Sequence, residues 1–366
     1  MSTQSENRSA NERKTENAAT FKVYPYRRMV QFGFLLLTIW IGIEFIVWVK
    51  QLESGLSPTL SRPPGVEVFL PLSALISLKY WLLTGVFNLI HPSGLVIFMI
   101  VLATGVLLKK GFCSWVCPFG LLSEYLAKIH IVLFDRIRKI PGWLDYPLRS
   151  LKYLLLLFFG GSILFGMNVL RLEQFINSPY NKVADIKMLQ FFANMSDVTL
   201  WTLVILVLLS ILIPYFWCRY LCPYGALLGM ISWFSPLKIH RNAESCIDCD
   251  KCTNVCPAGI QVHKANAVFS DECNACLECV DACPVKDTLY LSVTKKQWKL
   301  SRKAYLFILI GLFVLGTAMA KISGFWQNNI STKEYQYYIK RMNEPVYNHN
   351  RGAVPDYEGK SDQSRK

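Results

Sequence analysis

The sequence predicts an α-helical integral membrane protein with a small cysteine-rich domain inserted before its last membrane span. Two observations support this prediction. Of the 366 residues, 52% are hydrophobic, and they gather in blocks of about 20 residues, the length with which a helix crosses the hydrocarbon core of a bilayer. The 12 cysteines, in contrast, all fall into short, regularly spaced motifs outside those blocks.

About five apolar blocks are long enough to be transmembrane helices, at residues 29–49, 91–108, 151–170, 198–217 and 304–320. Residues 66–90 are apolar too, but they contain Glu67, Pro71 and Lys79. We expect this stretch to be an interfacial or re-entrant helix. The predicted domains are a disordered cytoplasmic tail (1–28), a membrane domain with four spans, the re-entrant segment and two cysteine pairs (29–240), a cysteine-rich domain (241–300), a last transmembrane helix (301–322) and a polar tail (323–366).

The distribution of basic residues predicts the orientation. Lys and Arg number 6 in residues 1–28, 7 in 109–149 and 11 in 218–303, but only 2 each in 51–90 and 172–197. Basic loops stay in the cytoplasm, so the cysteine-rich domain should be cytoplasmic and the C-terminus outside, although the basic tail does not follow the rule. The net charge of +14 is then explained by topology, and we expect no nucleic-acid partner because no such motif is present.

Eight cysteines form two copies of the motif C-x2-C-x2-C-x3-C-P, at residues 246–257 and 273–284. In bacterial ferredoxins this run holds two [4Fe–4S] clusters, and the fourth cysteine of each run binds the other cluster. Two zinc sites are the alternative, but two complete runs with closing prolines are more specific than zinc pairs. The sequence therefore predicts a ferredoxin-like α+β domain. Its two ligand sets would be Cys246, Cys249, Cys252 and Cys283, and Cys273, Cys276, Cys279 and Cys256.

The other four cysteines form two C-x3-C-P pairs that follow the second and fourth predicted spans. We call Cys113, Cys117, Cys218 and Cys222 the membrane-edge thiols. Spacing of i and i+4 would place each pair on one face of a helix, so we expect the four to form one shared site for a third [4Fe–4S] cluster, copper or zinc. The alternatives are disulfides, or separate redox dithiols or copper-binding pairs. Lys109, Lys110 and Arg219 would offset the thiolate charge.

Three ionisable residues lie in or beside the apolar segments, where such groups are costly and often functional. Glu44, Lys79 and His91 are candidates for a quinol-binding or proton-accepting site. The alternative is structural: a packed glutamate, a lysine that reaches the interface and a histidine that caps a helix.

The order of the motifs, two C-x3-C-P pairs and then two ferredoxin runs, resembles the membrane polyferredoxin family of NapH-, NosR- and CcoG-like proteins over roughly residues 62–298. The resemblance implies a multi-pass protein of the bacterial inner membrane that passes electrons between the quinone pool or a cytosolic donor and an unknown respiratory partner. It would be an electron-transfer subunit rather than a stand-alone enzyme. The alternatives are a cupric or other metal reductase or oxidase-assembly protein that uses the membrane-edge thiols, and a redox-sensing regulatory protein.

Overall fold

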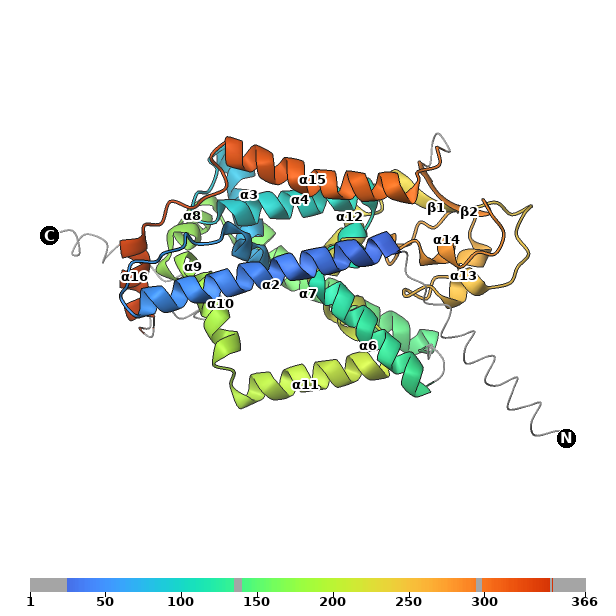
Figure 1. The fold of residues 1–366 in the computed structure, drawn as a ribbon, viewed down its shortest axis with the longest axis horizontal. Coiled ribbons are helices and arrows are strands. Elements are labelled where there is room, and N and C mark those ends of the chain that lie inside the picture. Colours follow the sequence, from blue (N-terminus) through green and yellow to red (C-terminus); the bar gives the residue numbers. More distant parts are fainter. Residues whose placement is uncertain (1–24, 135–139, 294–297, 343, 345–366) are drawn as a thin grey trace. The chain divides into compact units, whose positions relative to one another are not determined.

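The computed structural model describes residues 25–134, 140–293, 298–342 and 344. This part of the chain is mostly helical and contains one two-stranded antiparallel sheet (Figure 1). The chain divides into two compact units. The first, which we call the cysteine unit because it contains all of the cysteines, comprises residues 1–36, 101–156 and 198–310; the second unit comprises residues 37–100, 157–197 and 311–366.

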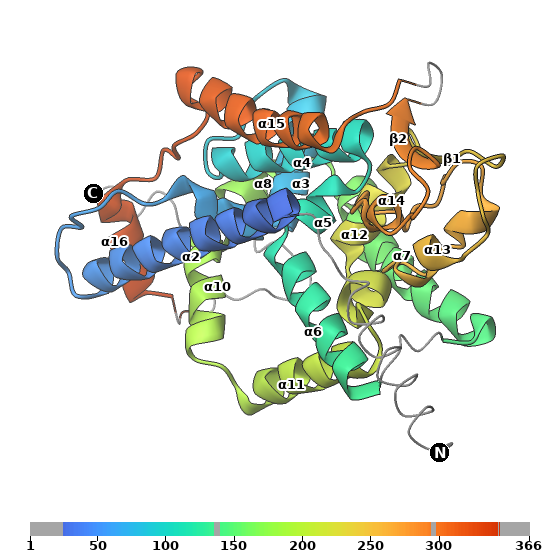
Figure 2. The same ribbon diagram turned by 45° about the vertical axis from the view of Figure 1, so that its right-hand side comes forward.

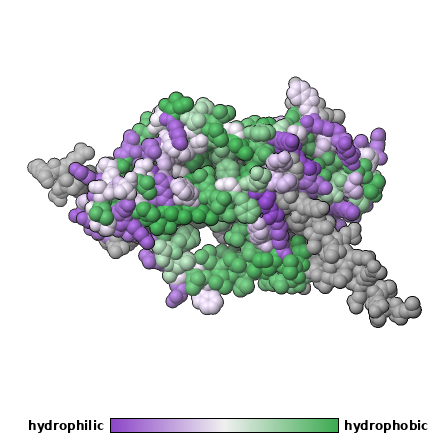
Figure 3. Space-filling view, in the orientation of Figure 1, coloured by the Kyte–Doolittle hydropathy of each residue, from purple (hydrophilic) through white to green (hydrophobic). Residues whose placement is uncertain are grey.

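Three helices are long and apolar enough to cross a membrane: α2 (Pro25–Glu53), α7 (Gly142–Gly166) and α15 (Arg302–Ile322). A fourth candidate is the pair α10 (Ala184–Ala193) and α11 (Asp197–Leu212), which is bent by 80°. Large apolar side chains cover the outer surface of α11 (Figure 3), as expected for a helix that faces lipid. Within the described residues the model thus has three or four candidate spans.

The second predicted span, residues 91–108, is the apolar helix α4 (Pro92–Leu108), which has only 17 residues. The predicted re-entrant stretch contains the short helices η1 (Pro64–Phe69) and α3 (Pro71–Thr84). Helix α3 has 14 residues, fewer than the roughly 17 needed to span a bilayer. It ends at Gly85, whose φ of 73° is the left-handed conformation that glycine adopts without steric cost.

One predicted boundary differs in the structure. Helix α2 begins at Pro25, not after residue 28, because proline is well suited to the first turn of a helix and the arginines that follow it find partners. The predicted polar tail contains helix α16 (Thr332–Lys340). Tyr335 of α16 is buried against Trp48, with ring centroids 5.0 Å apart. Residues 1–24 and 345–366 lie outside the described part.

The sheet of the cysteine unit frames the two ferredoxin runs. Strand β1 (Leu237–Arg241) precedes the first run and β2 (Leu289–Val293) follows the second, paired so that Leu237 lies opposite Val293. The other elements of this unit are α5 (Gly111–Trp115), α6 (Pro118–Phe134), η2 (Trp217–Leu221), α12 (Pro223–Ile231), α13 (Lys251–Asn254), η3 (Val262–Lys264) and α14 (Glu278–Asp281); the second unit also contains α8 (Val169–Asn177) and α9 (Pro179–Lys182).

Candidate iron–sulfur centres

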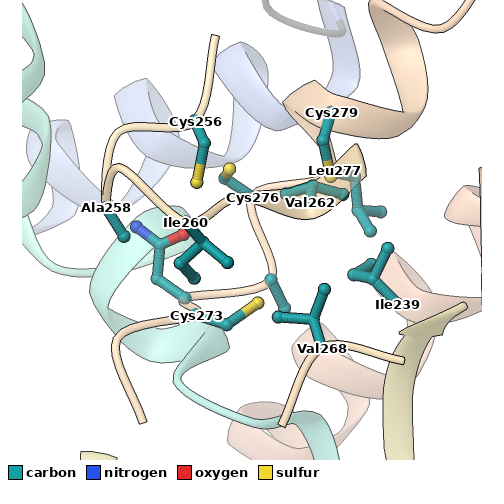
Figure 4. Close-up of a pocket in the computed structure, with 12 residues that line it drawn as sticks. Ile239, Cys256, Ala258, Ile260, Val262, Val268, Cys273, Cys276, Leu277 and Cys279 are labelled. Atoms are coloured by element: carbon teal, nitrogen blue, oxygen red, sulfur yellow. The ribbon is translucent and has the colours of Figure 1, made fainter. Parts of the chain in front are cut away.

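Two cavities of nearly equal volume lie in the cysteine unit, and four thiols line each of them. The outer cavity, about 350 Å³, is lined by Cys246, Cys249, Cys252 and Cys283. The inner cavity, about 360 Å³, is lined by Cys256, Cys273, Cys276 and Cys279, whose sulfur atoms surround a common space in Figure 4. Each cavity therefore combines three cysteines of one run with the fourth cysteine of the other run.

The loops that carry the first three cysteines of each run have the same unusual backbone. Asp248 and Asp250 in the first run, and Ala275 and Leu277 in the second, have φ between 49° and 65°. Residues other than glycine rarely adopt this left-handed backbone conformation. It costs of order 1–3 kcal/mol for each residue and persists where the surrounding structure requires it. The strain recurs at equivalent positions, one residue before and one residue after the second cysteine of each run. It bends each loop around its cavity.

The donor set fits a cluster better than a single ion. A zinc ion draws four thiolates to about 2.3 Å from one point, but no three His, Cys, Asp or Glu side chains in the described residues converge closely enough to hold one metal ion. In a [4Fe–4S] cluster each thiolate binds a different iron, so the sulfur atoms stand further apart. Burial raises the pKa of Cys256 to about 11, and iron binding would replace that proton. Such a cluster supplies one-electron transfer.

The two cavities differ in their exposure. Cys249 is exposed, and Ile247 beside it has 64% of its surface accessible. Cys276 and Cys279 are both buried. The outer cavity therefore lies near the surface of the cysteine unit, whereas the inner cavity lies within it.

The structure also brings the four membrane-edge thiols together. Burial raises the pKa of Cys117, and the neighbouring thiols of Cys113, Cys218 and Cys222 raise it further. Burial likewise raises the pKa of Cys113 to about 11 and that of Cys218 to about 12. The four thiols therefore lie within electrostatic range of one another, and Ser123 of α6, the helix that follows Cys117, contacts Cys218 Sγ at 3.2 Å.

The predicted geometry of each pair needs a correction. Cys113 lies in α5 and Cys218 in the π-helical segment η2, but Cys117 and Cys222 lie beyond these helices. The N–H groups of Cys117 and Cys222 donate to carbonyl oxygens five residues back, at 2.9 and 3.0 Å. Each precedes a proline that begins the next helix, and proline disfavours helical backbone in the residue before it. Both thiols therefore lie at helix N-termini, and the N–H of Gly225 donates to Cys222 Sγ at 3.3 Å.

Of the three basic residues predicted to offset the thiolate charge, only Lys110 is clearly placed to do so. Its ammonium, 5% exposed, interacts electrostatically with Cys113 and Cys222. Lys109 Nζ instead donates to the carbonyl oxygen of Val268 at 2.8 Å. Arg219 is neutralised by Asp145, with Nη2 and Oδ2 3.0 Å apart. The sequence could not distinguish these partners, which come from distant segments.

The structure gives Lys79 and His91 structural partners. Lys79 Nζ donates to the carbonyl oxygens of Ile163 and Leu164, both at 3.0 Å, and of Met167, so it caps the end of α7, where backbone carbonyls lack helical partners. His91 is 1% exposed, and its Nε2 donates to the carbonyl oxygen of Asn181 at 2.6 Å.

Glu44 is partly exposed on α2. In the described part of the chain, no hydrogen bond or ion pair joins any two of Glu44, Lys79 and His91. A quinol or proton role for these residues stays a prediction.

Sequence reasoning missed a buried charge network around Glu67 in the second unit. Glu67 Oε1 lies 2.8 Å from Arg62 Nη1 and 3.3 Å from His91 Nδ1. Arg62 also pairs with the buried Asp185 at 2.6 Å. A signal for this network was present in the sequence. Arg62 and Glu67 lie at the start of an apolar stretch, where a charged residue needs a partner of opposite charge. Although burial alone would raise it, the pKa of Glu67 is lowered to about 2 by Arg62, His91 and Ser93.

Glu67→Gln should lower the free energy of unfolding by roughly 3–5 kcal/mol at pH 7, because it leaves Arg62 and His91 without their carboxylate. A lowered pKa contributes stability above the unfolded value, so the advantage of Glu67 should shrink as the pH falls from 4.5 towards about 2. Thermal unfolding in micelles across this range measures it. Glu334→Gln, which breaks a pair with Lys182 at 32% exposure, is the control and should cost at most about 1 kcal/mol. Equal losses in both variants would contradict the prediction.

Comparisons with known proteins match these centres. A family model described as a 4Fe-4S dicluster domain matches residues 238–284, and one described as a 4Fe-4S binding domain matches residues 90–141 and 198–242, which contain both membrane-edge pairs. The chain is 41% identical over 330 residues to YccM of Escherichia coli strain K12, whose name assigns it to electron transport; the match covers 88% of this chain and 92% of YccM. The chain belongs to the membrane polyferredoxin family.

Two further relatives agree with this membership. The ferredoxin-type protein NapH of Haemophilus influenzae is 29% identical to this chain over 273 residues. The match covers 71% of this chain and 86% of NapH. The regulatory protein NosR of Pseudomonas aeruginosa is 28% identical over 186 residues, 47% of this chain and 24% of NosR. No solved structure matches. The resemblance predicted from the motif order is confirmed, as are the two [4Fe–4S] clusters. The protein is a multi-pass membrane iron–sulfur protein of electron transfer.

Proposed function

We propose that this polyferredoxin passes electrons between the quinone pool or a cytosolic donor and a respiratory partner. The observation that carries the proposal is the pair of adjoining four-thiol cavities, each completed by a cysteine of the other run. Two one-electron centres in one small domain form a path for electrons.

The ligand sets follow the cavities. Cys246, Cys249, Cys252 and Cys283 would hold the outer cluster, and Cys256, Cys273, Cys276 and Cys279 the inner one. The membrane-edge thiols would hold a third centre, and a third [4Fe–4S] cluster suits them best. The support is their mutual proximity, the buried ammonium of Lys110 beside two of them, and the match of their segments to a 4Fe-4S family model.

The orientation is part of the proposal: the protein lies in the inner membrane, with the cysteine unit's ferredoxin domain in the cytoplasm and the C-terminus outside. The distribution of Lys and Arg supports it. A reporter active only in the cytoplasm should work when fused after Pro284 and fail when fused after Lys360. A cytoplasmic reporter that is inactive after Pro284, together with an active periplasmic one, would reverse the orientation.

Electron exchange can be tested with the purified protein in lipid nanodiscs under anaerobic conditions. Chemically reduced protein is mixed with a quinone analogue, with an oxidised soluble ferredoxin, or with Cu²⁺, and the return of cluster absorbance is followed. We expect rapid oxidation by the quinone or by the ferredoxin. Rapid oxidation by Cu²⁺ alone would instead favour a metal reductase, and no exchange with any of the three would contradict a carrier function.

A further inference from the structure

One buried arginine of the cysteine unit contacts both the loop of the inner cavity and the segment that carries the first pair of membrane-edge thiols. Arg27, in the first turn of α2, is 3% exposed. Its Nη1 donates to Oε1 of Glu278 at 2.7 Å, and its Nη2 donates to Oε2 of Glu124 at 2.6 Å. Its Nε donates to the carbonyl oxygen of Ser114 at 3.1 Å. A single guanidinium thus holds three acceptors from three separate segments.

Two of these acceptors lie inside the cluster loops. Glu278 lies between Cys276 and Cys279, two thiols of the inner cavity. Ser114 directly follows the membrane-edge thiol Cys113. Glu124 belongs to α6, the helix that begins immediately after the second thiol of the same pair. The guanidinium therefore links the inner cavity to the membrane-edge thiols.

The same two loops also contact each other directly. Ser114 Oγ donates to the carbonyl oxygen of Asn274 at 2.6 Å, and Trp115 Nε1 donates to that of Ala275 at 3.1 Å. Asn274 and Ala275 lie between Cys273 and Cys276 of the inner cavity. Figure 2 shows α5, which contains Ser114 and Trp115, in the same part of the cysteine unit as α14, which follows this loop. The inner cavity is thus the one that adjoins the membrane-edge thiols, and the outer cavity is the one that reaches the surface.

We propose that Arg27 is a positioning residue that joins the membrane-edge site to the inner cluster, so that electrons pass through the inner centre between the membrane edge and an outer centre that meets the soluble partner. The inference rests on the proposed electron-transfer function. Arginine suits this role because its planar group spreads five donors over three nitrogen atoms, so that it can reach acceptors of three separate segments, whereas the donors of a lysine ammonium share a single nitrogen.

The charge of Arg27 also acts on the inner centre. Reduction of a cluster adds negative charge, and a buried positive charge nearby favours the reduced state because the surroundings screen it weakly. The carboxylates that interact with Arg27 are those of Glu278, Glu124 and Asp281, and it also interacts with the cluster thiol Cys276. Loss of the guanidinium would leave both carboxylates beside the inner centre, so its reduction should become harder.

Arg27→Gln, Arg27→Lys and Arg28→Gln test the proposal. Arg28 is the matched control, because it is the next arginine in α2 but donates to the hydroxyl of Tyr125 at 2.7 Å and lies 4.0 Å from Glu124, without an ion pair to Glu278 within the described residues. Midpoint potentials are measured by mediated titration with electron paramagnetic resonance. The inner and outer signals are assigned with Cys276→Ser and Cys249→Ser. Arg27→Gln should shift the reduction equilibrium of the inner centre at least tenfold, about 59 mV for one electron, while Arg27→Lys should restore most of it.

A second readout follows the junction itself. Amide hydrogen exchange of residues 111–117 and 273–279 should accelerate in both Arg27 variants and not in Arg28→Gln. Glutamine and lysine both lose the guanidinium hydrogen bonds that join the two loops, although lysine keeps the positive charge. Equal inner potentials in Arg27→Gln and Arg28→Gln, or a shift confined to the outer centre, would overturn the proposal. If Arg27→Gln fails to fold, unchanged exchange in Arg27→Lys would overturn it. Potentials measured with mediators do not depend on the natural donor or acceptor. A failure of the proposed electron-transfer function can therefore be distinguished from a failure of the role proposed for Arg27.

Discussion

Replacing Cys113 and Cys218 together by serine should lower the iron content of anaerobically purified protein from about twelve to about eight atoms per chain, the difference of one [4Fe–4S] cluster. One thiol is removed from each membrane-edge pair, so only Cys117 and Cys222 remain, which are too few to hold a cluster. The ferredoxin signals should persist, because those ligands lie in other loops. Metal analysis by mass spectrometry, with resonance spectra of the remaining clusters, measures the loss.

Two glycines of the same motifs offer a matched control that keeps every thiol. A Cβ at Gly120 would lie 2.0 Å from the carbonyl oxygen of Cys113, whereas one at Gly225 would lie 3.6 Å from Cys222 Sγ. The first approach is impossible without moving the Cys113 backbone, and the second is an ordinary contact. Gly120→Ala should therefore lose the third centre and Gly225→Ala should retain it. Unchanged iron, zinc and copper contents in the double serine variant would rule out a shared site.

Cys283→Ser should damage the outer cluster, although Cys283 belongs to the run whose other cysteines line the inner cavity. Loss of one thiolate of four should convert or release that cluster and remove its resonance signal, about four irons of the total. Cys256→Ser is the mirror control, because Cys256 belongs to the first run but lines the inner cavity. If each variant disturbed only the cluster of its own run, the crossed ligation would be wrong.

Local sequence was sufficient for the cluster motifs because their chemistry is encoded in spacing. Three cysteines at two-residue intervals, with a fourth before a proline, specify a loop that surrounds one cluster and turns away after it. The left-handed residues of those loops, such as Asp250 and Leu277, could not be predicted, because neither residue type requires that conformation. The apolar blocks identified a multi-pass protein by length alone, but the bent pair α10 and α11 shows that length does not fix how a block is broken.

The partners of buried charges were decided only by the tertiary structure. The sequence marked Lys109, Lys110 and Arg219 equally as neighbours of thiols, yet Lys109 and Arg219 find other partners, and only Lys110, which also interacts with Glu272, keeps its ammonium beside Cys113 and Cys222. Arg27 lay at the edge of a predicted disordered tail, and its role depends on carboxylates 97 and 251 residues away. Periodicity and motif spacing report short-range order, whereas a buried charge is stabilised by whichever opposite charge the fold brings within a few ångströms. The sequence by itself thus determined which centres this polyferredoxin builds, and the tertiary structure decided how they are joined.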